Sequence, residues 1–120
     1  MESTSELIES LKSYVADYAK ELETNTKDGS VMMMQELPVV STFYIADKEI
    51  IVFWKYKGKT FKYGDQLVFE ITDIWVDRNE TEYKTITTDS EISVDETENG
   101  EYSAYIYDEN AIITSLIHSI

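Results

Sequence analysis

The spacing of apolar residues changes near residue 39 of this chain, from helical to strand periodicity, and this change limits the folds that it can adopt. Between residues 7 and 22 apolar residues recur every three or four positions, which places them on one face of a helix. They are Leu7, Ile8, Leu11, Tyr14, Val15, Tyr18, Ala19 and Leu22. Ser3 and Glu6 form a capping-box pattern in front of them. The pattern predicts an amphipathic helix that begins after Ser3 and ends near Asn25.

From about residue 39 apolar and polar residues alternate, as in half-buried strands. One face is formed if the chain turns at Asp47–Lys48, and it holds Phe43, Ile45, Ile50, Val52, Trp54 and Tyr56. Gly58–Lys59 fits a type II′ hairpin loop, which would pair Tyr56 with Phe61 and Trp54 with Tyr63. Lys55 would then face Lys62, so we expect acidic neighbours on the next strand.

The later strands are predicted by the same alternation. Its parity shifts between Ile71 and Ile74, which indicates a β-bulge near Thr72–Asp73. A threonine-rich strand is expected at 83–88 and another at 92–94, and Asn99–Gly100 is the dipeptide of a type I′ turn. That turn would oppose Val94 to Tyr105 and Ile92 to Tyr107. The apolar run from residue 111 to 120 fits a short helix better than a strand.

The predicted fold class is α+β, in one domain over residues 1–120. An N-terminal amphipathic helix packs on a mostly antiparallel, meandering sheet of five to six strands, with a short C-terminal helix. With 42% hydrophobic residues the chain can bury a core without disulfides or metals. It has no cysteine, and no signal peptide or membrane-spanning run is evident, so the cytoplasm is the expected location.

Charge is the unusual feature of the composition. The net charge is −14, and residues 61–120 hold fourteen acids against three bases. Lysines instead gather between residues 48 and 62, where Glu49 is the one acid. A negative field of this strength repels nucleic acid and anionic membranes and attracts basic partners.

Catalytic signatures are absent from the sequence. The four glycines are isolated, so there is no glycine-rich phosphate loop, and His118 is the single histidine. Asp95 to Gly100 has part of the calcium-loop spacing, but the position that needs a carboxylate is Ile106, and a hairpin tip is favoured instead. We therefore expect no catalytic residue, no metal site and no cofactor.

The leading functional hypothesis is a non-enzymatic binding protein whose acidic face occludes a basic, nucleic-acid-binding surface of a partner protein. The carboxylates expected to bind the partner lie on predicted strands and turns: Glu80, Glu82, Asp89, Glu91, Asp95, Glu96, Glu98, Glu101, Asp108 and Glu109. In size, charge and lack of catalytic motifs the chain resembles small phage-encoded inhibitors of host defence, such as anti-restriction and anti-CRISPR proteins, and nuclease immunity proteins. The resemblance implies DNA mimicry, with carboxylates in place of phosphates.

Two alternatives stay open. In the first, the chain is an assembly subunit of a phage particle or multiprotein complex. Its contacts would then come from the apolar run at 31–34, the aromatic residues and the face of Lys55, Lys57 and Lys62. In the second, it binds a small ligand or is an enzyme with a cone-shaped helix-and-sheet fold. That alternative requires a deep pocket lined by Trp54, Tyr56 or Trp75 with one desolvated carboxylate.

Overall fold

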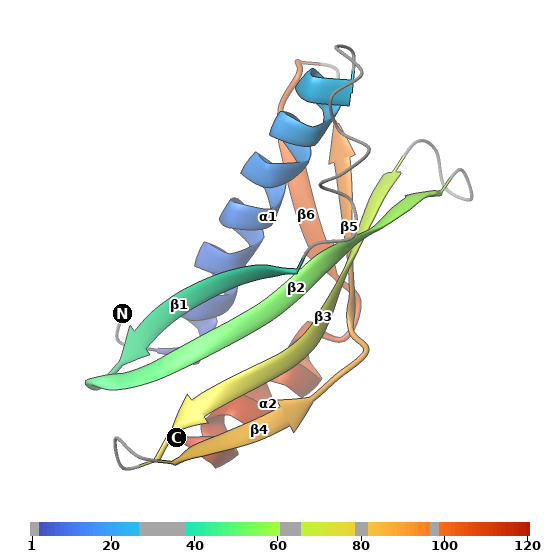
Figure 1. Cartoon of the computed structure of the whole chain (residues 1–120). Helices are drawn as coiled ribbons and strands as arrows, with labels where there is room; N and C mark the ends of the chain where they lie inside the picture. The colour runs from blue at the N-terminus through green and yellow to red at the C-terminus, as the bar shows by residue number, and fades with distance from the viewer. Residues whose placement is uncertain (1–2, 27–37, 61–65, 79–81, 97–98) are drawn as a thin grey trace.

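The structure, a computed structural model, describes residues 3–26, 38–60, 66–78, 82–96 and 99–120 (Figure 1). These ranges form two helices and six strands. The elements are α1 (Thr4–Thr26), β1 (Val39–Ile45), β2 (Lys48–Thr60), β3 (Gln66–Asp77), β4 (Tyr83–Thr87), β5 (Glu91–Glu96), β6 (Tyr102–Ile106) and α2 (Glu109–Ser119). The α+β class, the N-terminal helix, the antiparallel sheet and the C-terminal helix are all as predicted.

The six strands form one antiparallel sheet. Five of them follow the order β1-β2-β3-β5-β6, and the sixth, β4, pairs with β3 along the same edge that β5 uses. β3 is therefore shared, because its first half pairs with β5 and its second half with β4. The change of partner falls at Thr72, where the register with β2 also shifts. This confirms the predicted bulge. The backbone of Thr72 stays bonded, since its carbonyl accepts a hydrogen bond from the Thr88 amide at 3.1 Å.

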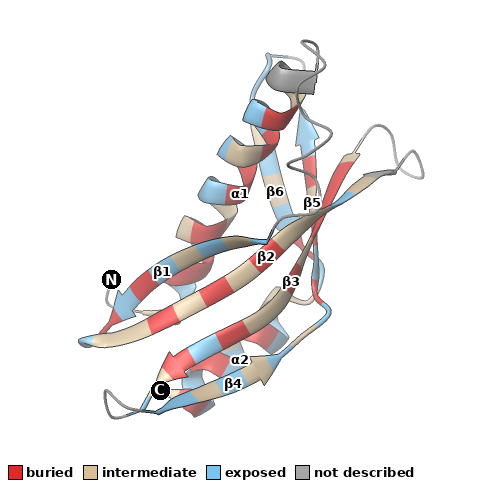
Figure 2. Ribbon diagram, in the orientation of Figure 1, coloured by how far each residue is buried: buried red, intermediate tan, exposed pale blue. Residues whose placement is uncertain are grey.

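Helix α1 begins as its capping pattern predicts, with the Glu6 amide donating to the Ser3 hydroxyl at 3.2 Å. Its apolar stripe is buried along the helix and faces the inner side of the sheet, next to β6 and behind β1 and β2 (Figures 1 and 2). Tyr14 is an exception, because 55% of it is exposed. The stripe explains why the helix forms here, since burial of one apolar face stabilises a helix more than intrinsic propensity does.

Both helices lie on the same face of the curled sheet, and the core fills the space between them and the strands (Figure 2). Alternate residues of each strand point into it, which gives the banded burial along β1, β2 and β3. At its centre Trp54 is 1% exposed and packs edge to face on Tyr18 and Phe69. The indole nitrogen donates to the Ser41 hydroxyl at 3.0 Å, so its polar atom is satisfied.

The predicted hairpin at Gly58–Lys59 is wrong. Strand β2 continues through both residues to Thr60, and Tyr56 lies opposite Phe69 of β3 and not opposite Phe61. Gly58 instead stands at a second register shift, with a φ of 136°. Glycine is suited to that position because it adopts positive φ without a steric cost. Lys62 lies outside the described residues, whereas Lys55 lies opposite Glu70, an acidic neighbour of the predicted kind.

The predicted register of the last hairpin is also wrong, by one residue. Val94 lies opposite Ala104 and Ile92 opposite Ile106, because the strands stop at Glu96 and Tyr102 and leave a longer connection than a two-residue turn. A slip of one residue exchanges the two faces of a strand. Ala104 and Ile106 therefore face the core, and Tyr105 faces outward.

The turn between β1 and β2 lies one residue earlier than predicted, at Ala46–Asp47, with φ values of 50° and 66°. Positive φ at both positions is the requirement of a type I′ turn, which Asn-Gly meets best.

We expect the double substitution Ala46→Asn with Asp47→Gly to raise the free energy of unfolding by about 0.5–1 kcal/mol. Urea denaturation measures this difference. The control substitution Asp95→Gly should lower the free energy of unfolding, because Asp95 has no positive φ and glycine weakens the interior of a strand.

Neither described helix is long and apolar enough to cross a membrane.

Candidate functional site

A groove of about 720 Å³ lies on the outer face of the sheet, over β3, β5 and β6. This face is opposite the one that packs on α1. Acidic, hydroxyl and aromatic side chains form most of its walls, which are lined by Gln66, Val68, Asp89, Ser90, Glu91, Ser93, Asp95, Tyr105, Tyr107 and Asp108. The volume falls in the range of ligand-binding pockets.

Four of the predicted partner-binding carboxylates line this groove, namely Asp89, Glu91, Asp95 and Asp108. Alternation along β5 explains two of them, since Ile92 and Val94 point into the core and leave Glu91 and Asp95 on the outer face. Asp89 precedes β5, and Asp108 precedes α2 on the neighbouring connection. The fold thus brings together carboxylates from two separate segments.

Asp108 is held in place by a chain of hydrogen bonds. The Ser90 hydroxyl donates to Asp108 Oδ2 at 2.8 Å, and the Thr88 hydroxyl lies 2.6 Å from the Ser90 hydroxyl. The Ser90 amide closes the chain by donating to Thr88 Oγ1 at 3.1 Å. Ser90 is buried, so the link between β4 and β5 is a fixed polar junction at one end of the groove.

Two tyrosines give the groove its aromatic surface. Tyr105 is 62% exposed and Tyr107 is 82% exposed, although large aromatic side chains are usually more deeply buried. The sequence-based register placed Tyr105 opposite Val94 on the core face, so it missed this role. Alternation around Ile106 could have indicated their position, because Tyr105 and Tyr107 flank this buried core residue.

Two lysines of β2, Lys55 and Lys57, lie near this acidic face, because β3 is the strand between β2 and β5. Lys57 Nζ lies 3.4 Å from Glu91 Oε1, and Lys55 lies opposite Glu70 in the β2–β3 register. Both side chains of the Lys57–Glu91 pair are substantially exposed, so the pair contributes little to stability. Breaking this ion pair therefore costs little stability.

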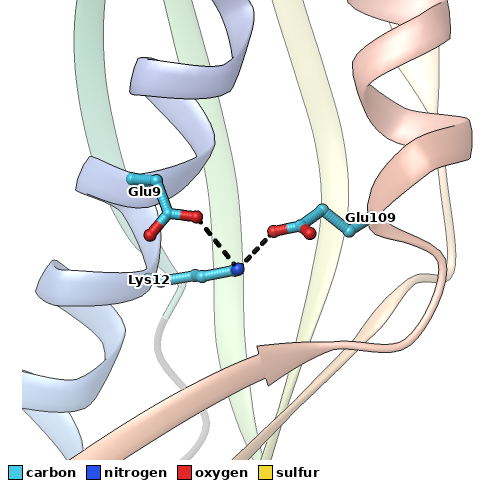
Figure 3. Close-up of polar contacts among 3 residues, drawn as sticks. All are labelled: Glu9, Lys12 and Glu109. Carbon is cyan, nitrogen blue, oxygen red and sulfur yellow. Dashed lines mark hydrogen bonds and ion pairs between the residues drawn. The ribbon is translucent and has the colours of Figure 1, made fainter.

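Glu109 lies apart from the groove and joins the two helices (Figure 3). Its carboxylate is bonded to the ammonium group of Lys12 on α1, and Glu9 contacts the same ammonium at 3.2 Å. The Lys12 side chain is 20% exposed. The hydrogen bond from Lys12 to Glu109 raises the pKa of Lys12 above its usual value of 10.5. The position of Glu109 favours a role in docking α2 on α1.

The other predicted carboxylates that the structure describes do not line the groove. Glu82 is exposed just before β4, Glu96 ends β5 opposite Tyr102, and Glu101 is exposed just before β6. Glu80 and Glu98 lie outside the described residues, as does the apolar run at 31–34. The described carboxylates form no group of three that could hold a metal ion.

The aromatic residues considered for an apolar pocket are divided between the two sides of the sheet. Trp54 is in the core, whereas Trp75 is 38% exposed on the outer face. A second, smaller cavity of about 190 Å³ lies between β4 and α2, and neither tryptophan lines it or the groove. Among the described residues, the groove is the larger of these two hollows and carries four of the predicted carboxylates.

No protein-family model, curated protein or solved structure matches this chain.

Proposed function

We propose that this chain is a non-enzymatic acidic binding protein whose groove docks on a basic, nucleic-acid-binding surface of a partner protein. The observation that carries the proposal is the groove itself, where four carboxylates and two exposed tyrosines share one surface. Carboxylates pair with arginine and lysine, and tyrosine rings stack on guanidinium planes. Arginine is also the residue that most often reads phosphate.

Occlusion is the proposed mechanism. The groove carboxylates take the place of phosphates on the partner, so that nucleic acid and this chain compete for the same arginines and lysines. The net charge of −14 speeds the encounter and disfavours direct contact with nucleic acid or anionic membranes. The cytoplasm, where such partners are found, is the proposed compartment.

The test is competition for a basic partner. The tagged wild-type chain and the variant Glu91→Gln/Asp95→Asn are each used to capture proteins from the source organism. Proteins that only the wild-type chain retains are purified and bound to fluorescent duplex DNA. We expect the wild-type chain to displace the DNA at concentrations at least about tenfold lower than the groove variant needs. The matched control Asp17→Asn/Glu21→Gln removes two charges from exposed positions of α1 and should displace DNA like wild type. A ternary complex in which the DNA stays bound would contradict occlusion.

An assembly role is the second candidate, and a different surface favours it. The outer face of β2, β3 and β4 carries Phe53, Trp75 and Tyr83. The ring centroids of Phe53 and Trp75 are 4.9 Å apart, and those of Trp75 and Tyr83 are 6.0 Å apart. No described helix covers this face, since both helices pack on the other side (Figure 1). Exposed aromatic surface of this kind is typical of protein interfaces.

A further inference from the structure

The outer edge of β1 has no strand beside it among the described residues, because the sheet ends there. β1 is seven residues long and contains no charged residue and no register shift. Natural proteins commonly protect such edges with charges, prolines or bulges. The other exposed edge, β4, is shorter and carries Lys84, and β6 lies against α1. β1 is therefore the edge best suited to pair with another strand.

Exposed apolar side chains gather on both sides of this edge. Val40 and Tyr44 point to the outer face and are 53% and 55% exposed. On the helix side Tyr14 is 55% exposed and packs on Phe43 with ring centroids 5.8 Å apart. A strand added to β1 would cover apolar surface on the two faces at once, which gives the pairing a hydrophobic contribution.

We propose that β1 pairs antiparallel with β1 of a second copy of this chain, about a two-fold axis at Thr42. The sequence of the strand is self-complementary in that register. On the outer face Val40 lies opposite Tyr44 of the other copy, and on the inner face Val39 lies opposite Ile45. β-branched and aromatic pairs of this kind stabilise antiparallel strands. A two-fold axis requires the same patch on both subunits, and this pattern satisfies it.

The charge distribution permits this association although both copies are acidic. β1 and β6 are at opposite ends of the strand order, so the groove carboxylates of β5 are remote from the paired edge in the sheet. The repulsion that remains acts over distance and is screened by salt. Pairing through β1 should therefore strengthen as salt rises, whereas binding of a basic partner to the groove should weaken. Because the two associations depend on salt in opposite directions, failure of the β1 pairing can be distinguished from failure of the proposed function.

Sedimentation tests the pairing. Over a protein range of about 10 μM to 1 mM, we expect the wild-type chain to shift from monomer to dimer, with a larger dimer fraction at high salt. Thr42→Lys places two like charges opposite each other at the axis and should lower the dimer fraction at least tenfold. Thr85→Lys adds the same charge at an exposed position of β4 and should leave dimerisation unchanged.

Cross-linking tests the register. The chain has no cysteine, so Thr42→Cys introduces a single thiol at the proposed axis. Mild oxidation should join two copies far faster in Thr42→Cys than in the control variant Thr85→Cys, whose thiol lies on β4. A wild-type chain that stays monomeric over the whole range, or equal effects of the two lysine variants, would overturn the pairing. A monomer that binds an extended peptide along β1 would assign the edge to a foreign strand instead.

Discussion

The variant Trp54→Ala is expected to lose about 3–5 kcal/mol of unfolding free energy, the largest stability change among the substitutions considered for this chain. Trp54 is 1% exposed and packs directly on Tyr18 and Phe69, and Tyr56 packs on Phe69 in turn. Removing the indole leaves a cavity where β2, β3 and α1 meet and leaves the Ser41 hydroxyl without its donor. Urea denaturation followed by far-ultraviolet circular dichroism measures the loss.

Trp75→Ala is the matched control, because it removes the same side chain from the outer face of the same sheet. Trp75 is 38% exposed, so we expect a loss of about 1–2 kcal/mol. Trp54→Phe keeps a ring in the core and provides a milder measurement should the alanine variant fail to fold. Equal losses at the two tryptophans would contradict the assignment of Trp54 to the centre of the core.

Lys12→Met is expected to lower the free energy of unfolding by about 2 kcal/mol near neutral pH, by leaving the partly buried Glu109 carboxylate without its cation. The double variant Lys12→Met/Glu109→Gln should recover most of the loss, since it removes the unpaired charge as well. Lys20→Met, at an exposed position of the same helix, should change stability by less than about 0.5 kcal/mol. Thermal and urea unfolding of the four proteins measure these differences.

The pH dependence of the Lys12 effect has a defined sign. The pKa of Lys12 is raised in the folded chain, mainly by its hydrogen bond to Glu109, so folding favours the protonated form. The stabilisation is present in full below the unfolded value of 10.5 and is lost as pH rises through the higher folded pKa. The difference between wild type and Lys12→Met should therefore shrink only above about pH 10.5. A difference that disappears on acidification to pH 6 would contradict the ion pair.

Periodicity predicted most of this fold, because burial of an apolar stripe is a local property that the sequence displays. The stripe of α1, the inward face from Phe43 to Trp54 and the bulge at Thr72 were all predicted from spacing. Turn lengths were not. Gly58 indicated a turn and occupies a bulge, since positive φ serves both structures equally well.

The candidate site could be predicted only in part, because its position also depends on turn lengths and strand register. Clustering of carboxylates in the second half of the chain indicated an acidic surface, and alternation along β5 places Glu91 and Asp95 together. The role of Tyr105 was missed because a one-residue change in hairpin register moves it to the opposite face. The contact of Glu109 with Lys12 joins the two ends of the chain, and no local pattern in the sequence indicates it.

Binding of a fluorescent arginine-rich peptide, measured by anisotropy between about 50 and 500 mM NaCl, tests most directly whether the groove recognises a basic partner. We expect the wild-type chain to bind the peptide and to lose at least about tenfold in affinity across this range. At low salt Glu91→Gln/Asp95→Asn should bind about tenfold more weakly than wild type, with a shallower salt dependence. The α1 control Asp17→Asn/Glu21→Gln, which changes the net charge equally, should bind nearly as wild type does. Equal weakening of the two double variants would show that net charge alone attracts the peptide, and would contradict a binding site in the groove.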